Sequence, residues 1–193
     1  MHSGTQRGLA PVKFLIDAAA SRFTVQASAT GLLSAFGHNP TIAIRDYQGE
    51  IQFASDTYQD AHVRVTVRTA GMEVLDEMKK DDREKLEKEM NDKVLEVPRF
   101  PTALFESRQL AVDKLSDSLL RARVTGELSF HGVTRTHSLE ARVTNIGSML
   151  RISGDFSLRH SDYEINPASF AAGALRLKDE VKFNFELLAR KQE

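Results

Sequence analysis

Apolar and polar residues alternate with a period of two along most of the chain. In the segment 21–29 the apolar positions Phe23, Val25 and Ala27 are separated by polar residues, which is the pattern of a strand with one buried and one hydrated face. The segments 61–69, 120–130, 139–143, 150–158 and 181–187 alternate in the same way, and 42–53 and 102–111 do so less regularly. Because parallel strands are covered on both faces and read as continuous apolar runs, these segments are predicted to be antiparallel strands.

Turn-forming residues lie between these strands and indicate the fold class. They occupy Asp113–Ser118, His131–Thr134 and Asn145–Ser148, which contain the Gly, Asn, Asp and Ser residues common in turns. About eight strands joined by short hairpins predict an all-β fold, an eight-stranded antiparallel β-barrel. A two-sheet sandwich is the competing architecture. The longest stretch without a clear period, 166–177, is predicted to be a loop near the barrel mouth.

One strongly charged segment is predicted to form a helix at about residues 78–95 instead of a strand. Between positions 76 and 93, 14 of 18 residues are charged. The apolar residues Leu86, Met90, Val94 and Val97 recur at spacings of four, four and three, which places them on one face of a helix. Because this stripe is narrow, it is expected to pack against the barrel, as a plug or a flanking helix, rather than against a partner.

The charged residues of this segment predict how the helix begins and how its polar face is stabilised. Asp81 or Asp82 is expected to cap the first turn. Three acid–base pairs, each with the acid four residues ahead of the base, are expected along the helix. They are Asp81–Lys85, Glu84–Lys88 and Glu89–Lys93.

Length and charge limit the classes of protein that fit this pattern. A chain of 193 residues is long enough for one domain with a sizeable core. Its 26 basic and 27 acidic residues give a formal net charge of -1, without the basic excess of a nucleic-acid-binding protein. The sequence has no cysteine, which excludes disulfides, thiolate metal sites and cysteine nucleophiles.

No segment of the sequence is typical of a membrane span or an export signal. The chain begins with polar residues, and the apolar run Phe14–Ile16 is far shorter than the core of a signal peptide or the roughly 20 residues of a span. The chain as written is therefore expected to be cytoplasmic, or periplasmic if a leader has been removed. No nucleic-acid partner is expected, and a homodimer is left open.

Candidate chemistry is sparse along the chain. The common motifs of phosphate, dinucleotide and zinc binding and the glycine-flanked serine elbow do not occur, so no cofactor, metal site or catalytic residue is predicted. His131 and His137 flank one hairpin, but alternation separates them. It places His131 on the polar face of its strand and His137 in register with Leu139 and Ala141, and both are expected at the surface or rim. His38, between Gly37 and Pro40, is the best placed to meet a polar ligand group, although a hydrogen bond within its own turn is the more common role.

Phenylalanines on the predicted inward faces indicate what the barrel interior can hold. They are Phe23, Phe53, Phe105, Phe130, Phe156, Phe183 and Phe185. Phe carries no hydrogen-bonding group, so it suits a dry interior. A barrel of eight strands is wide enough either to be filled by its own side chains or to hold one slender ligand. A packed core and a ligand cavity both remain open on the residue pattern.

Several segments, in a fixed order from Phe14 to about Arg190, resemble a known family. They are Phe14–Asp17 followed by Ser21–Val25, then Tyr47–Ile51, Arg99–Ser107, Gly126–Arg135 and Arg159–Ile165. Their order and spacing resemble the YceI-like family of lipocalin-like barrels. The resemblance implies a single domain at 13–190 after a flexible tail at 1–12, an extended antiparallel barrel around an elongated apolar tunnel, an inserted helix, and neither metal nor catalytic residues.

The resemblance also implies a ligand, namely a long-chain amphiphile such as a polyisoprenoid, an isoprenoid quinone or a fatty-acid-like molecule. Each buried methylene contributes about 0.8 kcal/mol, so a long tail binds with few polar contacts. The expected tunnel lining is Phe23, Val25, Phe36, Ile42, Ile44, Phe53, Val65, Val67, Phe105, Leu128, Phe130, Phe156, Phe183 and Phe185. Weaker candidates for the head-group site are His38, Asn39 and Arg45.

The expected role of such a barrel is carriage or sequestration of the amphiphile, in transport or stress response. Two alternatives belong to other classes of protein. One is an enzyme that acts on a small hydrophobic substrate, with His38 and a nearby acid as its reactive groups. The other is a structural or interaction barrel with a solid core, in which the helix provides a docking surface.

Overall fold

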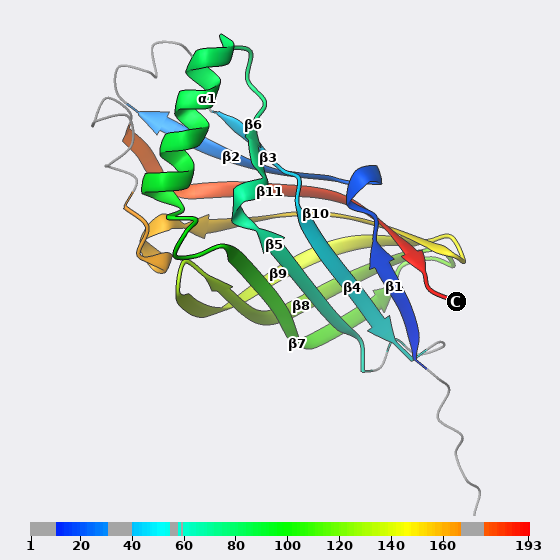
Figure 1. The fold of residues 1–193 in the computed structure, drawn as a ribbon. Helices are drawn as coiled ribbons and strands as arrows, with labels where there is room; N and C mark the ends of the chain where they lie inside the picture. Colours follow the sequence, from blue (N-terminus) through cyan, green and yellow to red (C-terminus); the bar gives the residue numbers. More distant parts are fainter. Residues whose placement is uncertain (1–10, 31–39, 55–57, 59, 167–175) are drawn as a thin grey trace, which may run out of the picture.

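The computed structural model describes residues 11–30, 40–54, 58, 60–166 and 176–193. Within these ranges the chain is mostly β-sheet (Figure 1). The strands are β1 (Val12–Ile16), β2 (Arg22–Thr30), β3 (Thr41–Ile44), β4 (Tyr47–Phe53), β5 (His62–Arg68), β6 (Met72–Val74), β7 (Thr102–Lys114), β8 (Leu119–Phe130), β9 (Val133–Asn145), β10 (Met149–Arg159) and β11 (Arg176–Lys191). Val12, assigned to the tail from the sequence, already belongs to β1. Residues 1–10 and most of the predicted loop 166–177 lie outside the described ranges.

Eight of these strands form a closed antiparallel ring. Their order is β1-β4-β5-β7-β8-β9-β10-β11, and β11 returns to pair with β1. In β1, Phe14 lies opposite Ile51 of β4 on one side and opposite Lys191 of β11 on the other. The predicted eight-stranded barrel is therefore confirmed. Because the ring closes through the β1–β11 pairing, neither strand has a free edge there.

The other three strands branch from the ring at the opposite end. The first part of β11 pairs with β2, β2 with β3, and β3 with β6. The single strand predicted at 42–53 is therefore two strands, because Arg45 and Asp46 leave the ladder between them. The N–H of Arg45 donates to the carbonyl of Gly71 at 2.8 Å, and the carbonyl of Asp46 accepts from the N–H of Arg68 at 2.8 Å. This junction separates β3 from β4 and aligns β3 with β6.

The predicted helix lies beside this branch. It consists of α1 (Lys80–Glu89) and a π-helical turn, Met90–Val94, which confirms the helix expected at about 78–95. The predicted cap was wrong, because Lys79 is the N-cap residue and makes no side-chain capping bond. Asp81 and Asp82 lie in the first turn instead, where their charge favours the helix N-terminus.

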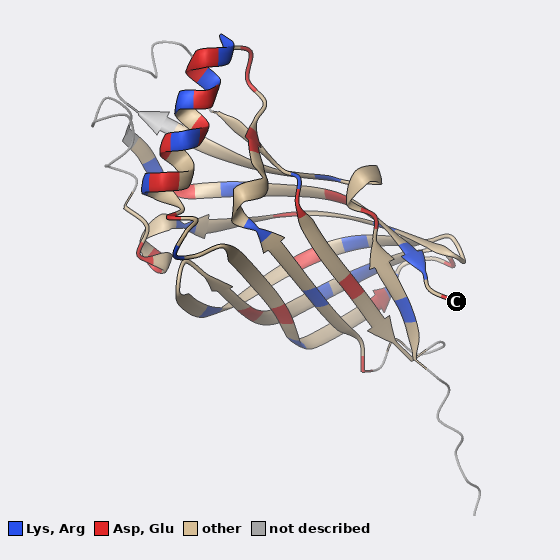
Figure 2. Cartoon of the chain, viewed as in Figure 1, with Lys and Arg blue, Asp and Glu red and all other residues tan. Residues whose placement is uncertain are grey.

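Most of the α1 ribbon is coloured as acidic or basic residues (Figure 2). Of the three predicted acid–base pairs, Glu89–Lys93 is present at 3.6 Å. The neighbouring lysines pair differently from the prediction, Lys80 with Glu84 and Lys88 with Asp92. An exposed lysine side chain can pair with any of several acidic residues at helical spacing, and such a pair contributes little to the free energy of folding.

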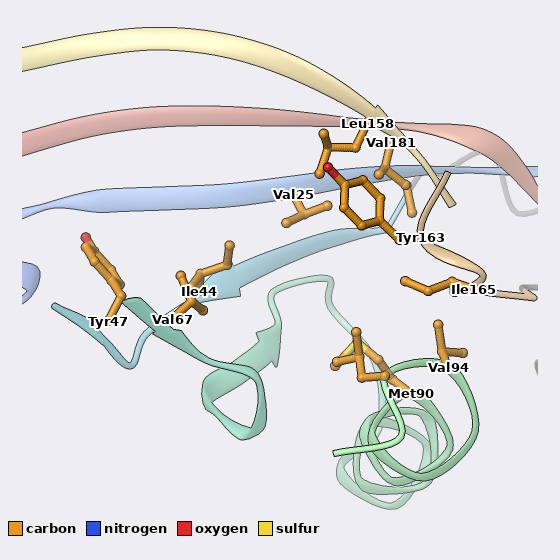
Figure 3. Close-up of a cluster of buried hydrophobic side chains, with 12 residues drawn as sticks. Val25, Ile44, Tyr47, Val67, Met90, Val94, Leu158, Tyr163, Ile165 and Val181 are labelled. Carbon is orange, nitrogen blue, oxygen red and sulfur yellow. The ribbon is translucent and has the colours of Figure 1, made fainter. Parts of the chain in front are cut away.

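Buried apolar residues form one cluster at each end of the barrel. At the end that carries the β7–β8 and β9–β10 hairpins, here called the hairpin end, the cluster includes Phe14, Phe53, Leu150 and Ala189. At the other end, here called the helix end, a second cluster joins strands of the barrel to the helix (Figure 3). No helix among the described residues is long and apolar enough to cross a membrane.

Candidate functional site

The barrel encloses an apolar cavity of about 310 Å³. All eight strands of the ring and the branch strands β2, β3 and β6 contribute side chains to its wall. The lining extends from Leu120 and Leu150 near the hairpin end to Met90 and Ile165 at the helix end. Its volume falls within the range of small-molecule sites. The barrel is therefore hollow, which answers the question that residue periodicity left open.

Most of the residues predicted to face the interior border this cavity. They are Phe23, Val25, Ile42, Ile44, Phe53, Val65, Val67, Phe105, Leu128, Phe130, Phe156, Phe183 and Phe185. The remaining predicted lining residue, Phe36, and the candidate head-group residues His38 and Asn39 lie outside the described residues. Arg45 is exposed, pairs with Glu73 at 2.9 Å, and is not among the residues that border the cavity.

Two glycines give the large aromatic rings room along the wall. A Cβ atom at Gly126 of β8 would lie 2.7 Å from Cζ of Phe105, and one at Gly154 of β10 would lie 2.7 Å from Cζ of Phe185. Each ring therefore lies over the bare backbone of a neighbouring strand. This packing keeps Phe105 and Phe185 against the wall, so that part of the lumen stays open.

An aromatic belt runs along the cavity wall from β4 to β9. It consists of Tyr47, Phe23, Phe183, Phe156 and His137, with successive ring centroids 5.6, 6.2, 4.6 and 5.3 Å apart. The Phe156 and Phe183 rings are stacked in parallel planes. Such a belt offers polarisable surface to an alkyl or polyene chain, and only its two end members carry polar atoms.

The helix closes one end of the cavity with its apolar stripe. Leu86, Met90 and Val94 border the cavity, and Met90 and Val94 are 5% and 7% exposed. In Figure 3 both side chains point from the helix toward Tyr163 and Ile165, which follow β10. The stripe recognised in the sequence is therefore used in docking the helix onto the barrel, as expected.

A comparison with protein families matches residues 14–189 to the YceI-like domain. The chain belongs to the YceI-like domain family. This membership confirms the resemblance in the sequence, and the match extends from Phe14 within β1 to Ala189 within β11.

Three solved structures share the fold of this protein at low sequence identity. BcnA of Burkholderia cenocepacia is 17% identical with a TM-score of 0.70, over 90% of this chain and 98% of that one. A polyisoprenoid-binding domain from Saccharophagus degradans is 16% identical with a TM-score of 0.66, over 95% and 99%. The YceI protein of Campylobacter jejuni is 17% identical with a TM-score of 0.59, over 79% and 85%. No curated protein matches the sequence.

The position predicted for His131 was wrong for this YceI-like domain. His131 is 7% exposed, with Nδ1 3.0 Å from the carbonyl oxygen of Tyr163 and Nε2 3.1 Å from a carboxylate oxygen of Glu96. Its φ is 50° and that of Gly132 is 78°, as in a two-residue hairpin turn. Because the turn begins at His131, the alternation of β8 no longer determines where its side chain points.

His137 was also predicted at the surface or rim, and it lies in the cavity wall instead. The sequence places His137 in register with Leu139 and Ala141, and this register correctly predicted that its side chain lies on the inward face of β9. His160, just after β10, borders the cavity as well. Burial lowers the pKa of both imidazoles; for His160 the carboxylate of Asp179 acts weakly in the opposite direction. Both rings are therefore neutral at neutral pH.

Tyr163 and His160 could not be found by alternation, because they lie in a short 3₁₀ turn, His160–Tyr163, beyond the strand. Tyr163 is 3% exposed, and burial raises the pKa of its phenol. The only sequence signal was the resemblance itself, which included the segment Arg159–Ile165. In the part of the chain that the structure describes, no three potential metal ligands gather at one place.

Proposed function

We propose that this YceI-like domain binds a long-chain amphiphile, with the tail of the ligand in the barrel cavity. The observation that carries the proposal is the cavity of about 310 Å³ inside the barrel, walled mostly by aliphatic and aromatic side chains from every described strand. Each methylene that leaves water for such a wall contributes about 0.8 kcal/mol. A tail of several isoprene units or methylenes therefore supplies enough free energy for tight binding with few polar contacts.

The relative from Saccharophagus degradans is described as a polyisoprenoid-binding domain, which makes a polyisoprenoid one candidate tail. Isoprenoid quinones and fatty-acid-like molecules have the same apolar chemistry and fit the same wall. Carriage or sequestration is the role that an apolar site inside a barrel supports, because the wall shields the tail from water.

The composition of the wall favours binding over catalysis. Among the described residues that border the cavity there is no aspartate or glutamate, so His137 and His160 have no carboxylate partner inside it. Asp179, which acts on His160 from outside, uses its two oxygens to accept bonds from the N–H and hydroxyl of Ser161. Among the described residues, the histidine–carboxylate arrangement of a general base is therefore not formed in the cavity; His38, the histidine of the enzyme alternative, lies outside them. A solid-cored structural barrel is inconsistent with the cavity.

Native mass spectrometry of the purified protein tests the proposal, with and without added long-chain amphiphiles. The wild-type protein should carry or take up one amphiphile, which solvent extraction releases. Leu128→Trp, which fills part of the cavity, should lose this uptake. Glu127→Trp is the matched control, because adjacent residues of a strand face opposite sides and Glu127 pairs with Arg108 outside the cavity. A wild-type protein that stays empty with every amphiphile would overturn the proposal.

A further inference from the structure

Backbone pairing between β9 and β10 stops halfway along both strands. The ladder runs from Asn145 opposite Leu150 to Glu140 opposite Asp155, although β9 begins at Val133 and β10 ends at Arg159. On their other sides the two strands stay paired to these ends, β9 with β8 and β10 with β11. Figure 1 shows β9 and β10 diverging from their common hairpin toward the helix end. We call residues 133–139 and 156–163 the β9–β10 seam.

Side chains, rather than backbone bonds, close the seam. Nε of Arg135 donates to the carbonyl of Asp162 at 2.6 Å. At the far end of β9, Nδ1 of His131 lies 3.0 Å from the carbonyl oxygen of Tyr163. These two contacts bridge the part of the seam farthest from the β9–β10 hairpin. Among the described residues, no backbone hydrogen bonds between β9 and β10 follow them.

His137 lies between these bridges and the end of the ladder. Its ring packs against Phe156 across the seam, with centroids 5.3 Å apart, and its Nε2 atom is buried without a hydrogen-bond partner in the described protein. His160 borders the same cavity, and its Nδ1 atom is buried and unpartnered, while its ring also has a hydrogen bond to the backbone of Lys178. Buried polar atoms are satisfied in most folded proteins, so two unpaired imidazole nitrogens on an otherwise apolar wall indicate a polar group that arrives with the ligand.

We propose that the β9–β10 seam is the head-group site of the cavity, where Nε2 of His137, with Nδ1 of His160 as a second contact, hydrogen-bonds a neutral hydroxyl or carbonyl group of the amphiphile. The proposal rests on the proposed function, since it assigns the polar end of the same ligand. It places the head group within the barrel wall, and the aromatic belt leads the tail away from His137 toward Tyr47.

The chemistry of the seam selects a neutral head group. A neutral imidazole nitrogen accepts a hydrogen bond from a hydroxyl or donates one to a carbonyl, according to its tautomer. A carboxylate or phosphate in the same place would lose its hydration without gaining a cation. Arg159 is the one arginine or lysine among the described residues of the cavity lining, and it is exposed. An anionic head group would therefore bind at Arg159, on the outer side of the seam.

Binding of three ligands with the same tail, hexadecanol, hexadecane and palmitate, tests the proposal. Dissociation constants are measured for the wild type, His137→Phe, His137→Gln and the control His62→Phe, whose histidine faces outward beside Glu106. The wild type should bind hexadecanol about tenfold more tightly than hexadecane, as expected for one hydrogen bond to a buried group. His137→Phe should abolish this preference and still bind hexadecane, whereas His137→Gln should retain most of it and His62→Phe all of it.

Three results would overturn the proposal and leave the proposed function intact. The first is equal binding of hexadecanol and hexadecane by the wild type. The second is a preference of His137→Phe for hexadecanol over hexadecane as large as that of the wild type. The third is that palmitate binds most tightly of the three and that His137→Phe does not change its affinity, which would place the head group at Arg159. Failure of all three ligands to bind the wild type is a different result, and it would overturn the proposed function together with the seam.

Discussion

The two ends of the barrel are closed in different ways. At the hairpin end, β1 bonds to both β4 and β11 and the β9–β10 ladder is intact, so the backbone itself completes the wall. At the helix end, three strands branch away, β9 and β10 separate, and the gap is closed by the helix and by the contacts of Arg135 and His131. Continuous ladders resist local opening, whereas closure by single side chains opens at lower free-energy cost. The proposed long-chain amphiphile is expected to enter at the helix end, because that end opens at lower free-energy cost.

The largest expected effect is the loss of a core side chain at the hairpin end. Phe14 is 2% exposed and stacks on Phe53 with centroids 5.6 Å apart, and it is not part of the cavity wall. Phe14→Ala should lower the free energy of unfolding by about 3–5 kcal/mol, measured by urea denaturation. Hexadecanol affinity of the folded protein should be unchanged. A loss of affinity without loss of stability would contradict the separation of the two ends.

The matching change at the helix end should affect binding more and stability less. Met90 is 5% exposed and borders the cavity. Met90→Ala should cost about 2 kcal/mol of unfolding free energy, at the low end for such a truncation, because the removed atoms adjoin space that is already open. Hexadecanol should bind several-fold more weakly, as titration calorimetry would show. If Met90→Ala were as destabilising as Phe14→Ala and bound hexadecanol normally, the helix would be an ordinary core element.

Mild acid should weaken the helix end before the hairpin end. The pKa of His137 and that of His160 are held below their ordinary value by burial, so the unfolded chain binds more protons than the folded one just below about pH 6.5. Stability should therefore fall as the pH falls through this range. Two aspartates also have a lowered pKa, Asp17 through its bond to Arg190 and Asp179 through its bonds to Ser161. They also make stability fall with falling pH, but only below about pH 4.

Thermal melting between pH 7 and pH 5 measures this effect. His137→Phe should melt with a smaller dependence on pH than the wild type, and His62→Phe with the same dependence. An unchanged slope in His137→Phe would show that other groups cause the acid sensitivity.

The smallest effect is expected on the polar face of α1. Lys80 pairs with Glu84 at 3.6 Å, and its side chain is 85% exposed. Lys80→Ala should leave the melting temperature and hexadecanol affinity within experimental error, because an exposed ion pair contributes little. A clear loss of either would mean that charges, and not the stripe of Leu86, Met90 and Val94, hold the helix on the barrel.

Alternation in the sequence was sufficient to predict most of the strands and the face of each that lines the barrel, but it did not predict β1 or β6 and did not separate a barrel from a sandwich. Alternation reports on burial directly, so Phe23, Phe183 and Phe185 could be assigned to the interior without knowledge of the strand partners. The stripe of the helix could be found for the same reason. His137 was given the correct register, and only the expectation that a histidine belongs at the rim was wrong.

Features that depend on long-range pairing could not be predicted. The break at Arg45 and Asp46 arises from hydrogen bonds to Arg68 and Gly71, and the seam arises because β9 and β10 stop pairing while both continue as strands. Local residue patterns do not encode which strand is bonded to which. The burial of His131 depends on a turn with positive φ, where the period of the strand no longer applies.

One fluorescence experiment tests directly whether a long-chain amphiphile lies inside the barrel. The chain has no tryptophan, so Phe183→Trp places a single reporter in the cavity wall, and Lys182→Trp places one on the exposed face of the same strand. A long-chain alcohol brominated along its tail quenches tryptophan only at close range. Quenching of Phe183→Trp should saturate at one equivalent, and Lys182→Trp should not be quenched. Equal quenching of the two, or none of either, would contradict binding inside the barrel.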